Sequence, residues 1–218
     1  DDIADVIFTG ENDNDFFGYS VSMAGDLNGD GFDDVVVGAS EYDEGRGATY
    51  VYFGGLVMNN IPDLILFGEE VDDNFGYSVS DAGDLNGDGY DDIVIGAYEY
   101  GIRQGRSYIF YGGESMDTIA DIILEGEVIY SFFGYSVSGA GDVNNDGYGD
   151  VLVGASRHDN YTGLSYLFFG GEEMDSIHDI TFVGETMSSE FGSVVSSAGD
   201  LNNDGFDDII IGAYGFNY

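Results

Sequence analysis

A single unit of 58 residues occurs four times along this 218-residue chain, with the same spacing throughout. Three landmarks define the unit: a Phe-Gly pair, an acidic loop and a Gly-Ala pair. They begin at Phe17, Phe75, Phe133 and Phe191, at Asp26, Asp84, Asp142 and Asp200, and at Gly38, Gly96, Gly154 and Gly212. A fixed period of this length is typical of repeat proteins, in which a unit buries its apolar face only against its neighbours. The units 5–62, 63–120, 121–178 and 179–218, the last one partial, therefore form one repeat domain.

The composition limits the partners of the chain. It carries 43 acidic residues, four arginines and no lysine, for a net charge of −39. This charge disfavours nucleic acid and anionic membranes as partners, because both require a basic surface; we expect neither nucleic-acid binding nor membrane binding. No apolar stretch approaches about 18 residues, so we expect no membrane insertion. The absence of cysteine excludes disulfides and thiolate metal sites.

Each unit reads as four short strands without helical periodicity. In the second unit the strand-like runs are 63–68, 75–82, 93–97 and 107–113. The run Phe75–Ala82 alternates large and small side chains, as a half-buried strand does, whereas Ile93–Ala97 is continuously apolar, as a strand buried on both faces is. Four antiparallel strands per unit form the blade of a β-propeller. The sequence predicts an all-β propeller; a β-solenoid is the alternative, although its turns are usually shorter.

The two ends of the chain fall at different points of the repeat. The chain opens with Asp5–Gly10, the counterpart of the strand that precedes each Phe-Gly pair, and it stops before a counterpart of Thr49–Phe53. We therefore expect an incomplete propeller or a part of a larger one. Either further chain or a neighbouring molecule would complete the last blade.

The acidic loop has the spacing of a calcium site. In Asp26–Asp34, side chains with oxygen stand at loop positions 1, 3, 5 and 9, a glycine at position 6 permits a sharp turn, and position 7 offers a carbonyl. Ca²⁺ requires six to eight oxygen ligands and tolerates flexible geometry, whereas Mg²⁺ fits an all-protein cage less well. The predicted ligands of the four calcium ions are Asp26, Asn28, Asp30, Phe32 (carbonyl) and Asp34; Asp84, Asn86, Asp88, Tyr90 (carbonyl) and Asp92; Asp142, Asn144, Asp146, Tyr148 (carbonyl) and Asp150; and Asp200, Asn202, Asp204, Phe206 (carbonyl) and Asp208.

A plain hairpin turn is the alternative for these loops, because Asn-Gly and Asp-Gly are strong turn formers. That alternative leaves three carboxylates within nine residues unexplained, four times over. Position 12, where an EF-hand has glutamate, falls inside a predicted strand, and position 8 is Asp33, Asp91 and Asp207 but Gly149 in the third loop. Position 8 is not an expected ligand, so all four sites are predicted to be intact.

The order of these landmarks resembles the FG-GAP repeat, the blade unit of the integrin α-subunit propeller and of many secreted bacterial and algal proteins. The resemblance covers almost the whole chain. It implies calcium in the loop between the first two strands of each blade, on the face opposite the usual ligand surface. It also implies an extracellular or cell-surface location and a complete ring of seven blades, of which fewer than four are present in this sequence.

Nothing in the sequence indicates catalysis. His158 and His178 occupy different positions in their units, and neither stands near a candidate nucleophile. The leading hypothesis is a calcium-stabilised adhesion module for a protein or glycan ligand. Its candidate surface is the loop after each Gly-Ala pair, which varies between units: Glu41–Gly47, Glu99–Gly105 and Arg157–Gly163.

These variable loops carry three of the four arginines and the aromatic residues Tyr42, Tyr100 and Tyr161. The tyrosines are candidates for stacking on sugars, although loop aromatics more often pack against the protein. Asn160 begins a glycosylation sequon. Two other functions stay open: a filament or sheath in which self-association completes the last blade with the Asp5–Gly10 strand of a neighbour, and a propeller appendage of a secreted hydrolase.

Overall fold

The computed structural model describes residues 4–215. Its strands form three four-stranded antiparallel sheets and one two-stranded sheet, each made of strands consecutive in the chain. The first sheet contains β1 (Phe17–Met23), β2 (Val35–Ala39), β3 (Ala48–Tyr52) and β4 (Leu64–Phe67). The second contains β5 (Ser78–Gly83), β6 (Asp92–Ala97), β7 (Arg106–Phe110) and β8 (Ile122–Glu125). The third contains β9 (Phe133–Gly141), β10 (Asp150–Ala155), β11 (Leu164–Phe168) and β12 (Ile180–Val183), and the last contains β13 (Phe191–Gly199) and β14 (Asp208–Ala213).

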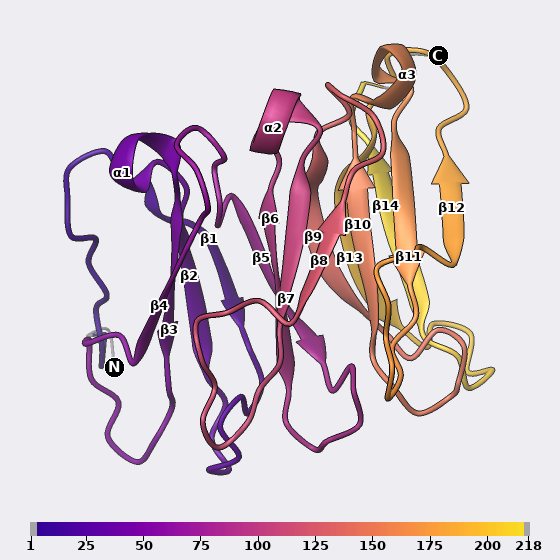
Figure 1. Cartoon of the computed structure of the whole chain (residues 1–218). Helices are drawn as coiled ribbons and strands as arrows, with labels where there is room; N and C mark the ends of the chain where they lie inside the picture. Colours follow the sequence, from indigo (N-terminus) through magenta and orange to yellow (C-terminus); the bar gives the residue numbers. More distant parts are fainter. Residues whose placement is uncertain (1–3, 216–218) are drawn as a thin grey trace.

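The sheets stand side by side, and their connections separate into two ends (Figure 1). Three short helical turns, α1 (Tyr42–Gly45), α2 (Tyr100–Arg103) and α3 (His158–Tyr161), join the second and third strands at one end. The acidic loops join the first and second strands at the opposite end, because the strands alternate in direction. The all-β architecture with four strands per unit is confirmed, and the loops after the Gly-Ala pairs contain a helical turn.

The boundaries of the sheets differ by one strand from the boundaries of the sequence units. The strand that opens the second unit, β4, pairs with β3 and so completes the first sheet rather than the second. β8 and β12 close the second and third sheets in the same way. Each blade thus runs from a Phe-Gly pair to the strand before the next one, and in the described residues the fourth sheet lacks its third and fourth strands.

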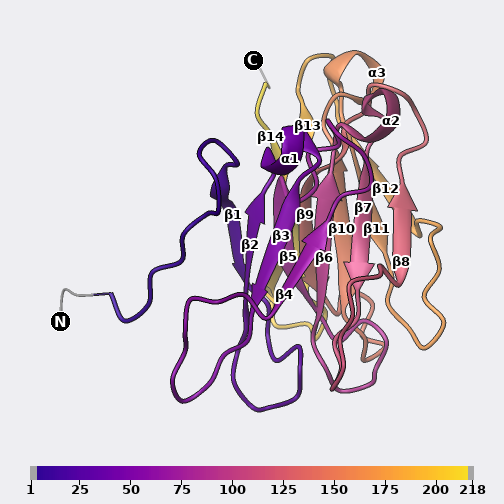
Figure 2. The same ribbon diagram turned by 60° about the vertical axis from the view of Figure 1, so that its left-hand side comes forward.

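The prediction of a strand at Asp5–Gly10 is wrong, because the structure forms no strand there. This segment has no strand pairing, and Figure 2 shows it running apart from the first sheet. Its counterparts β4, β8 and β12 each pair with the third strand of the preceding sheet, and within residues 4–215 no such partner lies beside it. A β-strand requires that hydrogen-bonding partner.

The central strands carry the core. Every residue of β6 and β10 is buried, as their continuous apolar sequences predict, and the clusters around them include side chains from two adjacent sheets. β14 has the same type of sequence but is only partly buried, because no third strand lies beside it in the described residues. Adjacent sheets therefore supply the burial that a single unit cannot, as expected for stacked repeats.

Serines join the first strands of adjacent sheets. Ser20 Oγ accepts a hydrogen bond from the Val79 amide (2.9 Å), and the same contact recurs one unit later between Ser78 and Val137 (3.0 Å). Because these strands share no ladder, the hydroxyl groups satisfy amides that would otherwise lack a partner. The small residues that alternate along these strands are therefore connectors between blades.

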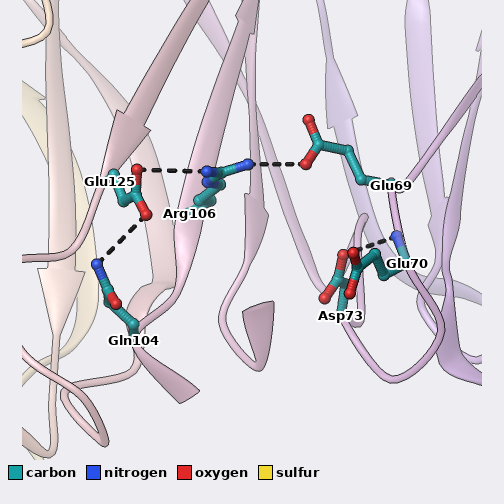
Figure 3. A network of polar contacts seen from close by, with 6 residues as sticks. All are labelled: Glu69, Glu70, Asp73, Gln104, Arg106 and Glu125. Atoms are coloured by element: carbon teal, nitrogen blue, oxygen red, sulfur yellow. Dashed lines mark hydrogen bonds and ion pairs between the residues drawn. The ribbon is translucent and has the colours of Figure 1, made fainter. Parts of the chain in front are cut away.

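The side chain of Arg106 links the second sheet to the preceding connection. Arg106 begins β7, and its guanidinium contacts Glu69 (2.7 Å) in the loop after β4 and Glu125 (3.3 Å) at the end of β8 (Figure 3). It also lies 3.6 Å from the centroid of the Tyr100 ring. The arginine side chain is only 16% exposed, so these partners offset the cost of removing its charge from water.

Candidate metal centres

The first acidic loop folds around the carboxylate of Asp26. Its two oxygens accept hydrogen bonds from the amides of Gly29 (2.8 Å), Asp30 (3.0 Å) and Gly31 (2.8 Å). Gly31 adopts φ +88°, a left-handed conformation that glycine takes without the strain of a side chain. The loop therefore turns its backbone around position 1, which leaves the remaining lone pairs of the carboxylate available to a cation.

Positions 3 and 5 continue the same turn. Asn28 Oδ1 accepts a hydrogen bond from the Asp30 amide (2.9 Å), and Asp30 Oδ1 accepts one from the Phe32 amide (3.0 Å). Both contacts recur in the three other loops, at Asn86 and Asp88, Asn144 and Asp146, and Asn202 and Asp204. The four loops thus share one local geometry, which follows from side chains that bond their own backbone two residues later.

Position 9 lies at the base of each loop, where the second strand begins. Asp34 is fully buried; its carboxylate accepts hydrogen bonds from the Leu27 amide (2.9 Å) and the Gly54 amide (2.7 Å). Asp92 and Asp150 repeat this arrangement. Asp208 keeps only the contact to its own loop, from the Leu201 amide, because the described residues contain no strand equivalent to the one before Gly54.

The buried carboxylates are poorly stabilised as anions. Burial raises the pKa of Asp34 to about 6, of Asp92 to about 7 and of Asp150 to about 6. In the first loop the backbone hydrogen bonds lower this pKa, but the negative charges of Asp30 and Asp26 raise it further. Each site thus holds an anion that lacks a compensating positive charge. A bound divalent cation would supply that charge.

The donor set of each loop fits calcium. Within residues 4–215, no three carboxylate or imidazole groups converge as closely as metal ligands do. The loops nevertheless offer only hard oxygen donors: three carboxylates, one amide and one carbonyl each. This set suits Ca²⁺ and excludes metals that prefer sulfur or nitrogen ligands. The three aspartates of each loop would hold the ion, whose positive charge would offset the repulsion between them.

The raised pKa values predict opposite pH responses with and without calcium. Each aspartate has a higher pKa in the folded, metal-free chain than the ordinary value of 3.8, so that fold gains stability as the pH falls from about 7 to about 4. Calcium binding requires the carboxylates, so its stabilisation decreases over the same range. Thermal unfolding in EGTA and in calcium, at pH 5 and pH 7.5, measures both.

A triple variant distinguishes the contribution of these three carboxyl groups to the pH response from that of the other acidic residues. Asp34→Asn, Asp92→Asn and Asp150→Asn together remove the three titrating groups and keep their size. In EGTA, the gain in stability between pH 7.5 and pH 5 should be clearly smaller for this variant than for the natural sequence. An equal gain in both proteins would assign the pH response to the other acidic residues.

Position 8 has a role that the sequence analysis missed. Asp91 Oδ2 accepts a hydrogen bond from the amide of Asp26 in the preceding blade (2.8 Å), and its own amide donates to the Asp26 carbonyl (3.3 Å). The carboxylate lies so close to Gly25 that a Cβ there would be 2.1 Å from it. Asp207 makes the same contact with Asp142 (2.9 Å). These aspartates thus fix the first ligand of a neighbouring acidic loop.

The junction between the second and third blades lacks this contact. Gly149 replaces the aspartate; its amide still donates to the Asp84 carbonyl (2.9 Å), but no carboxylate reaches back to the second loop. Gly83, the counterpart of Gly25, consequently has open space beside it. The sequence does contain a signal for this contact, because three of the four units have aspartate at position 8. The partner of that aspartate lies 65 residues away in the chain, so a local reading does not find it.

We expect Asp91→Ala to reduce the free energy of unfolding of the calcium-loaded chain by about 1–2 kcal/mol, because it removes a partly buried, charge-assisted hydrogen bond between blades. Denaturant unfolding measures the change. Asp33→Ala is the matched control, because Asp33 occupies the same loop position but is exposed and accepts no hydrogen bond within residues 4–215. Equal losses in both variants would contradict a specific role for Asp91.

The predicted ligand loops lie together at the end opposite the acidic loops, and their tyrosines differ in environment. Tyr42 packs against Phe67, with ring centroids 5.6 Å apart, and Tyr100 lies under the Arg106 guanidinium. These two rings are used in packing. Tyr161 is 45% exposed, so it keeps a free surface.

Comparison with known proteins identifies the repeat. The model of the FG-GAP repeat matches residues 17–52, 75–110, 133–168 and 191–218. The chain belongs to the FG-GAP repeat family. Its three complete sheets correspond to FG-GAP blades, and its fourth sheet is a partial blade.

Integrin alpha subunits are among the relatives of this FG-GAP chain. It is 34% identical to integrin alpha-5 of Xenopus laevis over an aligned length of 218, and the alignment covers 93% of this chain and 20% of the relative. It is 39% identical to human integrin alpha-6 over an aligned length of 156, and the alignment covers 68% of this chain and 13% of the relative. It is 40% identical to integrin alpha-7 of Rattus norvegicus over an aligned length of 160, and the alignment covers 70% of this chain and 14% of the relative. The chain thus spans a fifth or less of the length of these relatives.

Within the described part of the FG-GAP chain, no helix has the length and apolar character needed to cross a membrane.

Proposed function

We propose that this chain is a calcium-stabilised, non-enzymatic adhesion module that acts outside the cell and binds a protein ligand. The observation that carries this proposal is the division of the molecule into two ends. The acidic loops are nearly identical in all four units, whereas the loops with α1–α3 differ from unit to unit (Figure 1). A constant end suits repeated ion binding, and a variable end on a rigid scaffold suits recognition.

The relationship to integrin alpha subunits supports a receptor-like role. The acidic loops support calcium as the cofactor, with one ion in each of the four loops. Calcium would act on stability rather than on chemistry, since its binding energy becomes folding energy when a loop cannot close without it. Four divalent ions neutralise only part of a net charge of −39, so the remaining acidity fits exposure to a saline medium.

A binding assay tests the adhesion proposal. The 218-residue chain is immobilised and presented with purified extracellular matrix proteins and polysaccharides, in calcium and in EGTA. We expect saturable, calcium-dependent binding to a protein, and its loss when residues 157–163 are replaced by the sequence of 41–47. Replacement of an exposed connection at the acidic end, residues 56–60, by the sequence of 114–118 is the control.

Sedimentation of the same chain distinguishes the adhesion-module hypothesis from the filament hypothesis. A single calcium-loaded species whose mass does not change with concentration supports the module. Polymers that grow with concentration, together with no binding to any protein in the panel, would contradict it and favour assembly between chains.

A further inference from the structure

A pocket of about 320 Å³ opens between the second and third blades, at the end with the variable loops. Arg103 of α2 forms one side, and Arg157, His158 and Tyr161 at α3 form the other. The connection before β9 contributes the remaining wall through Ile129, Tyr130 and Phe132. Two of the four arginines of a strongly acidic chain thus converge on one cavity.

Arg157 is held by aromatic rings and not by an acid. Its guanidinium carbon lies 4.1 Å from the centroid of the Phe132 ring and 5.3 Å from that of Tyr161. Within residues 4–215, this guanidinium has neither an ion pair nor a hydrogen bond, in a chain with 43 acidic residues. Stacking fixes the plane of the group and leaves its N–H donors free, the arrangement in which arginine binds a carboxylate with two parallel hydrogen bonds.

Of the two arginines in the pocket, Arg157 is the one without an acidic partner within residues 4–215. Arg103 lies 5.8 Å from the Phe132 ring and pairs with Glu99 at 3.4 Å. Asp159 is the acid among the lining residues, and its carboxylate accepts a hydrogen bond from the Asn160 amide group (3.2 Å). The pocket therefore pairs one arginine with an acid from its own blade and keeps the second for a ligand.

The same scaffold carries the opposite charge one blade earlier. The counterpart of Arg157 is Glu41 in the first unit and Glu99 in the second. The hollow at the preceding junction is lined by Asp72 and Glu99, together with Arg103. The repeat therefore does not require a cation at this position, and the change from Glu to Arg is specific to one junction.

Tyr130 stands at a position that costs stability. Its φ is +61°, a left-handed conformation that is unfavourable for bulky side chains. The counterparts in the first two units are Asn14 and Asp72, residue types that tolerate this conformation. Tyr130 is nevertheless 57% exposed, so it does not serve the core. A strained, exposed aromatic residue beside a free arginine indicates a binding surface.

We propose that this pocket binds a carboxylate side chain in an acidic segment of a protein ligand, with Arg157 as its main contact. This inference rests on the proposed function. The exposed apolar and aromatic lining favours a protein over an acidic polysaccharide: Ile129, Tyr130 and Tyr161 line the cavity and are 52%, 57% and 45% exposed. Exposed aliphatic, tyrosine and arginine side chains are the usual composition of a protein interface.

Peptide titration of the calcium-loaded 218-residue chain tests the proposal. The probes are acetyl-Gly-Glu-Gly-amide, its glutamine counterpart and a glucuronate disaccharide. Amide chemical shifts of residues 129–132 and 157–161 report binding. We expect the glutamate peptide to bind there at least roughly tenfold more tightly than the glutamine peptide, because only the former carries the carboxylate. Binding by the disaccharide alone would overturn the proposal.

Arg157→Glu installs the residue that this chain itself carries at Glu99, and it should weaken binding of the glutamate peptide by roughly tenfold or more. Arg157→Gln should have a smaller effect in the same direction. Arg46→Glu makes the same charge change in the first blade, outside the pocket, and should leave binding within about twofold of the natural chain. Unchanged binding in Arg157→Glu, or an equal loss in Arg46→Glu, would overturn the proposal.

Thermal unfolding in calcium and in EGTA accompanies every titration. If the glutamate peptide does not bind although calcium still stabilises the chain, the pocket proposal fails and the calcium-stabilised module stands. If calcium has no effect on the chain, the proposed function itself fails.

Discussion

Chelation with EGTA is expected to lower the unfolding temperature of this chain by roughly 20 °C or more. A site with free calcium at about a hundred times its dissociation constant contributes roughly 2.7 kcal/mol. Four such sites together approach the total stability of a typical domain, about 5–15 kcal/mol. For a chain of this size, each kcal/mol corresponds to a few degrees in the unfolding temperature, about 2–4 °C.

The electrostatics of the loops explain why removal of calcium should lower the unfolding temperature. Without an ion, each loop holds three carboxylates on one turn of backbone, and in the first three loops the carboxylate at position 9 is buried without a compensating positive charge. Calorimetry or circular dichroism with 2 mM calcium and with EGTA, at a fixed ionic strength of about 0.15 M, measures the change. Magnesium at the same concentration is the control, and it should restore only a small part of the stability.

Superimposable unfolding curves in calcium and EGTA would show that the acidic loops are turns without a structural ion. Equal protection by sodium chloride would show that general screening, and not a bound ion, stabilises the fold.

The second large effect concerns the glycines of the Gly-Ala pairs. Gly96 lies against the carbonyl of Gly134 in the next blade, and a Cβ at Gly96 would stand 2.1 Å from that oxygen. Gly38 and Gly154 face Gly76 and Gly192 in the same way. The neighbouring atom is backbone, so it cannot move aside as a flexible side chain would. The repeated Phe-Gly and Gly-Ala pairs thus mark one close approach between adjacent blades.

Gly96→Ala is therefore expected to reduce the free energy of unfolding by about 3 kcal/mol, at the upper end of the range for overpacked cores. Gly212→Ala is the matched control, because the nearest atom to a Cβ at Gly212 is 3.5 Å away and the described residues contain no following blade. Urea unfolding of both variants in calcium measures the difference. A loss below about 0.5 kcal/mol in Gly96→Ala would contradict the close approach.

The sequence predicts the local features of this fold well, because each is repeated four times. The continuous apolar run at Ile93–Ala97 and the turn residues of the acidic loops determine their own conformation, and the structure places both as expected. The Asp5–Gly10 strand was not predictable in the same way. Its sequence matches β4, but a strand forms only beside a partner, and the part of the chain that the structure describes provides none for it.

The contacts between blades could not be predicted from local sequence patterns, because they join residues that lie far apart in the chain. Asp91 reads as a spare acidic residue of its own loop, and only the structure shows that it holds the loop of the preceding blade. The pocket at Arg157 likewise unites α2, α3 and the connection before β9, which are separated in the sequence. A comparison of the repeats still gives a signal, because the change from Glu99 to Arg157 and from Asp72 to Tyr130 marks that junction.

The calcium content of the purified chain tests the central claim most directly. The 218-residue protein is equilibrated with calcium, passed through a desalting column and analysed by atomic emission, alongside the single variants Asp30→Ala, Asp88→Ala, Asp146→Ala and Asp204→Ala. The account predicts four calcium ions per chain and one fewer in each variant. A chain that retains no calcium, or variants that all retain as much as the natural sequence, would contradict it.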